Sequence, residues 1–219
     1  MKKIYIIVIL ILLLTSPLFA GTYYVSSNGE ATWTNCEHNA SPVGPKSATS
    51  ACSMKTANDN VSPGDTVYIR GGSYTIDDTG DGDNPGIYPN QSGTEGNYVT
   101  YIIYGDETAT FTGDGTDNHS NAVYLRNRSF IRVSGLDFEH CNTLLTINGK
   151  EKYSPYAMVG ADYNVIDNCT FRYGRSWDPP LDYPCAWRGS EIVYRAHHNW
   201  IHDCTFQEFG ELTTSYDAG

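Results

Sequence analysis

The chain has 219 residues, with 14 Lys or Arg against 25 Asp or Glu, so its formal net charge is −11 at pH 7. Such an acidic chain is a poor partner for nucleic acid and for anionic membrane surfaces. The composition is rich in Tyr, Thr, Asn, Asp, Ser and Gly, which offers little from which amphipathic helices could form and favours many short strands.

The first twenty residues have the layout of a secretory signal peptide. Lys2 and Lys3 form a positive start, Ile4–Leu14 is a short apolar run, and the small Ala20 precedes Gly21. The run is too short to span a bilayer comfortably, so we expect cleavage after residue 20, with an uncleaved anchor as the alternative. Loss of both lysines leaves 12 basic and 25 acidic residues, a net charge of −13. We expect a secreted, extracellular or periplasmic protein with no membrane contact after cleavage and no nucleic-acid partner.

Residues 21–60 are expected to form an N-terminal capping and loop region. Cys36 and Cys52 flank a stretch rich in Ser, Pro and Ala, and secretion would allow them to form a disulfide. Sequence alone cannot fix the pairing, so the bonded and the free state both stay open here.

From residue 61 onward, short apolar segments alternate with Gly, Asn and Asp clusters. Gly64–Thr75 alternates apolar residues and then turns at two glycines, Asn97–Gly115 reads as two short strands around Gly105, and Asn121–Phe138 follows directly. This region therefore predicts a succession of short strands with tight turns between them.

Three later segments share one pattern, and their Phe residues are spaced by 33 and 35 positions: Ile131–Phe138 (IRVSGLDF), Asn164–Phe171 (NVIDNCTF) and Asn199–Phe206 (NWIHDCTF). Self-similarity at such a period is typical of a solenoid. The apolar columns, which strand alternation predicts to face inward, are Val133, Ile166 and Ile201; Leu136, Cys169 and Cys204; and Phe138, Phe171 and Phe206. The polar columns, predicted to face outward, are Ser134, Asp167 and His202, then Asp137, Thr170 and Thr205.

The column between the two short strands of each segment holds Gly135, Asn168 and Asp203. These residue types tolerate a left-handed backbone, which would make a sharp bend without a long loop. The pattern therefore predicts an all-β, right-handed parallel β-helix over residues 21–219, with coils in 61–219 that number about five or six at the usual repeat length. In this fold Cys169 and Cys204 are stacked inward residues whose expected role is core packing, and a disulfide between them is compatible with the pattern but not required.

The segment Val61–Thr75 (VSPGDTVYIRGGSYT), preceded by Thr22–Gly29 (TYYVSSNG), resembles the opening coil of secreted right-handed β-helix proteins of the pectate-lyase-like superfamily. The two later segments that end in CTF resemble its later coils. The resemblance implies the fold, which hosts lyases, hydrolases, epimerases and non-enzymatic surface proteins. Asn199–Cys204 is similar to the WIDH motif of one pectate lyase family, but His202 and Asp203 exchange the ligand order, so no metal site is carried over.

Members of this superfamily usually run through more coils and have a capped end. We therefore expect the sequence to be a fragment, with an incomplete C-terminal end of the β-helix. Further site residues would then lie past Gly219.

The richest cluster of candidate site residues lies in Tyr194–Asp203 (YRAHHNWIHD). A lyase that acts by β-elimination needs a base and a positive group, and the candidates for catalysis are Arg195, His197 and His202. Nearby residues that could bind or stack against sugars are Arg172, Arg175, Trp177, Trp187 and Arg188. The alternative is that these Arg and His side chains are solvated at coil turns and that the Trp residues pack against the stack.

Two acidic loops, Asp77–Gly86 and Gly113–His119, invite a calcium interpretation. The first fails the EF-hand pattern because its twelfth position is Tyr88, and a plain Asp/Gly turn is the alternative for both. No protein metal site is predicted, and Ca²⁺ stays open as a cofactor.

We expect a monomer that binds a polysaccharide, with an acidic glycan as the first candidate and a uronate lyase as the leading activity. A non-catalytic adhesin or carbohydrate-binding protein is the alternative from another class, and a glycoside hydrolase is the third hypothesis.

Overall fold

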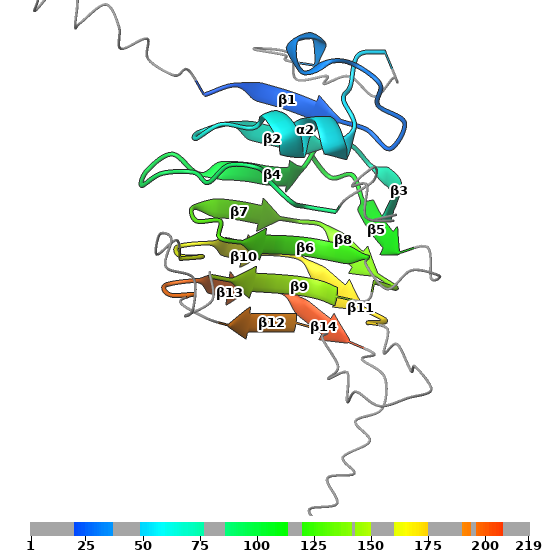
Figure 1. Ribbon diagram of the computed structural model, residues 1–219. Helices are drawn as coiled ribbons and strands as arrows, with labels where there is room; N and C mark the ends of the chain where they lie inside the picture. Colours follow the sequence, from blue (N-terminus) through cyan, green and yellow to red (C-terminus); the bar gives the residue numbers. More distant parts are fainter. Residues whose placement is uncertain are drawn as a thin grey trace, which may run out of the picture.

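The computed structural model describes residues 20–36, 49–76, 86–113, 120–141, 143–149, 160–174, 190–193 and 196–207. These residues form three parallel β-sheets, a short α-helix and one 3-10 turn. Figure 1 shows the strands stacked one above another, with β1 at one end of the stack and β12, β13 and β14 at the other. The all-β prediction and the predicted parallel pairing are thus confirmed for the described residues.

The first sheet has six parallel strands and carries one strand from each successive level of the stack. In spatial order they are β1 (Thr22–Val25), β2 (Thr66–Ile69), β4 (Val99–Ile103), β7 (Ile131–Ser134), β10 (Val165–Asp167) and β13 (Trp200–His202). The spatial order follows the chain order, so each new strand is added at the same edge of this sheet. Residues 21–60, expected to cap the fold, thus contribute β1 as the first strand of this sheet.

The other two sheets are built in the same way. The second contains β3 (Gly72–Ile76), β5 (Ala109–Gly113), β8 (Asp137–Glu139), β11 (Thr170–Arg172) and β14 (Thr205–Gln207), and the third contains β6 (Asn121–Arg126), β9 (Thr143–Asn148) and β12 (Ser190–Val193). All neighbouring strands are parallel. Such a chain, which passes repeatedly through the same sheets, is consistent with a β-helix or solenoid.

The predicted columns are present in the strand register. Val133, Ile166 and Ile201 are direct partners across β7, β10 and β13. The polar column also aligns, since Ser134 pairs with Asp167, and Asp167 with His202. The alternation of the repeats therefore sets the register of this sheet, as expected for a period of two.

The bend between the first and second sheets uses a left-handed residue at three successive levels. Gly135, Asn168 and Asp203 have φ values of 73°, 54° and 53°, which confirms the predicted column. At Gly135 a side chain would also be crowded, because a Cβ atom would lie 2.6 Å from Cγ2 of Ile103, which would have to shift. A left-handed residue thus lies at the turn from β7 into β8, and its counterparts repeat the turn in the next two levels.

The core is organised as ladders of like side chains. Tyr74, Phe111, Phe138, Phe171 and Phe206 occupy successive levels of the second sheet, and their ring centroids are 4.6, 5.3, 5.1 and 5.0 Å apart. The three central Phe side chains are buried, whereas Phe206 at the last level is 43% exposed. Each of the three central rings packs on the level before and the level after, whereas Phe206 has a ring partner on one side only.

A buried asparagine ladder fixes the other corner of the first sheet. The Asn164 side chain accepts a hydrogen bond from the Ile131 amide (3.0 Å) and donates one to the Arg128 carbonyl (2.9 Å). Asn199 repeats the arrangement one level later with the amide of Asn164 (2.9 Å) and the carbonyl of Ala161 (2.8 Å). These side chains satisfy backbone groups at the turns that lead into β7 and β10, where the hydrogen bonds between strands have not yet begun.

The N-terminal region adds the helix α2 (Met54–Asn60) and the 3-10 turn η1 (Trp33–Asn35). The Ser53 hydroxyl accepts a hydrogen bond from the Thr56 amide at 3.1 Å and caps α2. Cys36 and Cys52 form a disulfide, which settles the pairing that the sequence left open. Within the described residues, no helix is long and apolar enough to cross a membrane.

Candidate functional site

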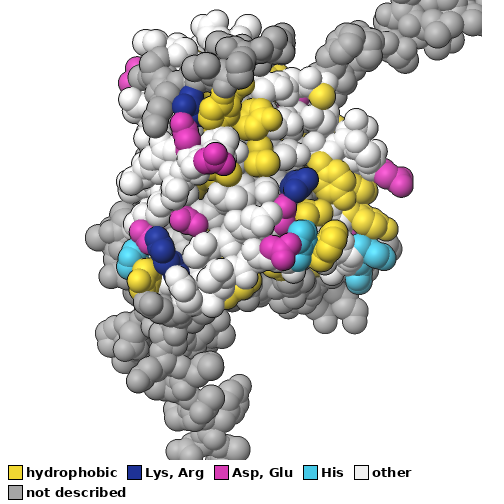
Figure 2. All heavy atoms as spheres, turned by 180° about the vertical axis from the view of Figure 1, so that it is seen from behind, with side chains coloured by type: hydrophobic (Ala, Val, Ile, Leu, Met, Phe, Trp, Pro, Cys, Tyr) yellow, Lys and Arg dark blue, Asp and Glu magenta, His cyan; other side chains and the backbone are white. Residues whose placement is uncertain are grey.

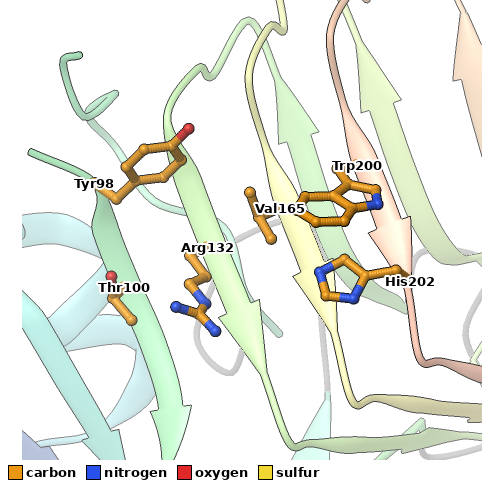
Figure 3. A pocket seen from close by; sticks show the side chains of 6 residues that line it. All are labelled: Tyr98, Thr100, Arg132, Val165, Trp200 and His202. Carbon is orange, nitrogen blue, oxygen red and sulfur yellow. The ribbon is translucent and has the colours of Figure 1, made fainter. Parts of the chain in front are cut away.

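The candidate site is a groove of about 500 Å³ on the outer face of the first sheet. We call it the sheet-face groove, and its lining residues are Tyr98, Thr100, Arg132, Val165, Trp200 and His202. Figure 3 shows these side chains on the same side of the sheet, carried by β4, β7, β10 and β13 and the residue before β4. The groove therefore runs across the strands, along the direction in which the levels are stacked.

Strand register explains why these side chains meet. Thr100, Arg132, Val165 and Trp200 are successive partners across the four strands. His202 lies two residues after Trp200, so it projects from the same face of β13. The groove is thus a direct consequence of the outward columns of the repeat.

Arg132 and Asp167 form an ion pair across β7 and β10. The Arg132 Nε and Nη2 atoms donate to the two carboxylate oxygens at 3.2 and 2.8 Å, and the side chains are 46% and 3% exposed. Burial alone would raise the pKa of Asp167, but hydrogen bonds and charge from Arg132, with contributions from Ser134 and His202, outweigh it and lower the pKa below the ordinary value. Asp167 therefore holds the guanidinium in a defined position beside the groove.

His202 is oriented by two neighbours. Its Nδ1 atom lies 2.7 Å from a carboxylate oxygen of Asp203, and its ring lies 4.1 Å from that of Trp200 at 33°. Asp203 has a left-handed backbone, and its carboxylate reaches back to the imidazole of the preceding residue. A carboxylate on Nδ1 leaves Nε2 as the nitrogen available for proton transfer.

An aromatic ladder borders the groove where the chain enters the strands of the first sheet. Phe130 and Tyr163 are stacked at 5.1 Å, Tyr163 and His198 at 4.7 Å, and Tyr98 meets Phe130 edge-on at 5.7 Å. Phe130, Tyr163 and His198 each have a positive φ, between 56° and 58°. The stacked rings thus line one side of the groove, and Tyr163 stays 43% exposed within the ladder.

Trp200 is 62% exposed, more than any other large hydrophobic side chain in the part of the chain that the structure describes. It lies in the groove itself rather than in the ladder. Figure 2, which views the molecule from behind, shows histidine, acidic, basic and hydrophobic side chains gathered on one part of this side. The groove thus combines an exposed aromatic surface with charged groups, as ligand sites commonly do.

The sequence-predicted site residues divide into three groups. His202 lines the groove. His197 is exposed on the loop before β13, where its amide donates to Asp162 at 2.7 Å, and it does not line the groove. Arg172 lies in the second sheet, where it is in register with Gln207 and its Nε atom donates to Glu139 at 2.8 Å. The remaining candidates lie outside the described residues: Arg195, Arg175, Trp177, Trp187 and Arg188.

Sequence reasoning missed Arg132 and the role of Asp167. The sequence pattern predicts that Asp167 faces outward in a column with Ser134 and His202. In the structure the side chains of Ser134 and Asp167 are buried, at 5% and 2% exposure. Arg132 lies directly before the column of Val133 and shares its register position with Val165 and Trp200. Reading that column along the repeat could have revealed it.

The described residues contain no group of three or more His, Cys, Asp or Glu side chains that could hold a metal ion. Both oxygens of Asp167 are occupied by Arg132, and one also accepts from Asn168 at 3.1 Å. This donor set does not fit Ca²⁺, which needs several oxygen ligands. Most of the two acidic loops, residues 77–85 and 114–119, lies outside the described residues.

Comparison with known proteins finds no family model, no curated protein and no solved structure that matches this chain. The function is therefore argued from the groove itself.

Proposed function

We propose that this protein is a secreted, right-handed parallel β-helix of the pectate-lyase-like type that binds a uronate-containing polysaccharide in the sheet-face groove and cleaves it by β-elimination. The parallel sheets support the architecture, and parallel strands are almost always joined by right-handed crossovers. The signal-like first twenty residues support secretion.

The observation that carries the proposal is the grouping of Arg132, Trp200 and His202 in one groove. A uronate offers a carboxylate for the guanidinium and a ring for the indole. His202 supplies a proton acceptor held by Asp203.

The proposed reaction uses these three side chains. His202 Nε2 takes the proton from the carbon next to the uronate carboxylate, and the negative charge spreads onto that carboxylate as an enolate. Arg132 stabilises the charge through guanidinium N–H groups that Asp167 does not occupy. The bond from the neighbouring carbon to the glycosidic oxygen then breaks, a carbon–carbon double bond forms, and the leaving sugar oxygen takes up a proton.

A non-catalytic glycan-binding protein is the second candidate. The observation that favours it is that Arg132 is already paired with a buried carboxylate, so part of its charge is balanced before any ligand binds. A glycoside hydrolase is supported least, because Glu139 of β8 is engaged by Arg172 and by the Thr112 hydroxyl, at 2.8 and 3.3 Å.

The test is to incubate the protein with a panel of uronate polysaccharides, with and without Ca²⁺, and to follow the ultraviolet absorbance of the unsaturated product. We expect a rise in absorbance on at least one polymer. If the protein is folded and binds a glycan on an array but produces no absorbance on any polymer, the second candidate replaces the lyase.

A further inference from the structure

Cys169 and Cys204 occupy the same position in successive levels of the stack. Each follows the left-handed residue of its bend and directly precedes a strand, β11 or β14, and Thr170 and Thr205 pair in register. Neighbouring parallel strands lie about 4.8 Å apart, which falls within the range of Cα separations that a disulfide bridges.

The two thiols occupy equivalent local surroundings. Each Sγ lies near the carbonyl two residues back, at 3.3 Å for Asp167 and 3.2 Å for His202. Each also lies near a carbonyl of the previous level, at 3.8 Å for Val133 and 3.5 Å for Ile166. Each thiol is also the largest cause of the shift in the pKa of the other.

The two thiols are chemically unequal. The neighbouring Cys169 thiol lowers the pKa of Cys204 to about 7, whereas the Cys204 thiol and burial raise the pKa of Cys169. Cys204 is half-buried and Cys169 is 1% exposed. An accessible thiolate beside a buried partner thiol is the arrangement of an attacking and a resolving cysteine.

We propose that Cys169 and Cys204 are a modification site at which a small-molecule disulfide, such as oxidised glutathione, installs a cross-level disulfide. The Cys204 thiolate attacks one sulfur of the reagent, forms a mixed disulfide and releases one thiolate. Cys169 loses its proton and attacks Cys204 Sγ, which expels the second thiolate. Two protein thiols thus lose two electrons and two protons, and one reagent disulfide becomes two thiols.

The bond would join the level that contains β10 and β11 to the level that contains β13 and β14, at the bend between the first and second sheets. The chain already contains one disulfide, Cys36–Cys52. This inference does not depend on the proposed lyase activity, and neither readout below involves a glycan.

The test uses the full chain, reduced and then exposed to oxidised glutathione, followed by alkylation and peptide mapping by mass spectrometry. We expect a peptide pair joined through Cys169 and Cys204, two hydrogen atoms lighter than the reduced pair, in the wild type and in the Cys141→Ala variant. The fully buried Cys141 serves as the control because its pKa is raised to about 12 by burial.

A second readout uses only the wild-type protein. In the reduced protein at pH 7, Cys204 is expected to react with iodoacetamide at least about tenfold faster than Cys141, because the thiolate is the reactive form. The proposal is overturned if both thiols remain alkylatable after oxidation, if either cysteine is joined instead to Cys185, or if Cys204 reacts no faster than Cys141.

Discussion

Arg132 and Asp167 are diagonal neighbours across two levels of the stack, joined by two hydrogen bonds of 3.2 and 2.8 Å. Arg132 is the register partner of Val165, and Asp167 that of Ser134. The guanidinium is half exposed at the groove while the carboxylate is buried. The pair thus connects the interior of the sheet face to the surface where a ligand would bind.

Replacing Arg132 with Ala should destabilise the protein. The Asp167 carboxylate would stay buried with its main partner removed, and an unsatisfied buried group costs about 1–3 kcal/mol. Urea unfolding measures the loss, with Arg126→Ala on β6 as the control because Arg126 is exposed. If both variants lose the same stability, the pair does not stabilise the fold.

The contribution of Asp167 to stability should depend on pH in a defined direction. Because the folded state lowers its pKa, the contribution is fully present above the unfolded pKa of about 3.9 and is lost as the pH falls through the folded value. The gap in melting temperature between wild type and Asp167→Asn is therefore expected to be constant between about pH 5 and 7 and to shrink towards pH 3. A gap that widens on acidification would contradict the lowered pKa.

The left-handed bends make a separate prediction. Asn168→Ala and Asn168→Gly both remove the hydrogen bond to Asp167, but only Ala carries a Cβ into the left-handed region, at a cost of about 1–2 kcal/mol. The Ala variant is expected to be less stable than the Gly variant by that amount in urea unfolding. Equal stability of the two would show that the bend tolerates another backbone conformation.

The phenylalanine ladder should weaken towards its last level. Phe138→Ala removes a fully buried ring stacked on both sides and is expected to cost about 3–5 kcal/mol. Phe206→Ala removes a ring that is 43% exposed and is expected to cost less than about 2 kcal/mol. The comparison is made by chemical denaturation, and a larger loss at Phe206 would contradict the arrangement of the ladder.

The repeats predicted much of the fold because the register of a parallel sheet follows from alternation. The columns of Val133 and Phe138 and the bend at Gly135 were all readable from three aligned segments. The third sheet was missed because β6 and β9 carry apolar residues at neighbouring positions, without clean alternation. Helix α2 was missed because its apolar content is low and its stability rests on the Ser53 cap and on buried Asn58.

The candidate site was less accessible to sequence reasoning. The sequence prediction rested on residues 194–203 because basic side chains are dense there. The groove is instead lined by residues of four strands that are about 33 positions apart in the sequence. Arg172 is close to this cluster in sequence but lies in another sheet. The second left-handed column at Phe130, Tyr163 and His198 could not be predicted from residue type, because bulky aromatic residues rarely adopt that conformation.

The most direct test of the central claim is the turnover of wild type and His202→Gln on the polymer that gives the strongest ultraviolet signal. Gln retains a polar side chain but cannot act as the base, so we predict a fall in kcat of at least about 100-fold with KM nearly unchanged. The control is His140→Asn, since His140 follows β8, packs on Tyr173 and does not line the groove. Undiminished cleavage by a folded His202→Gln variant would contradict the assignment of the sheet-face groove as the catalytic site.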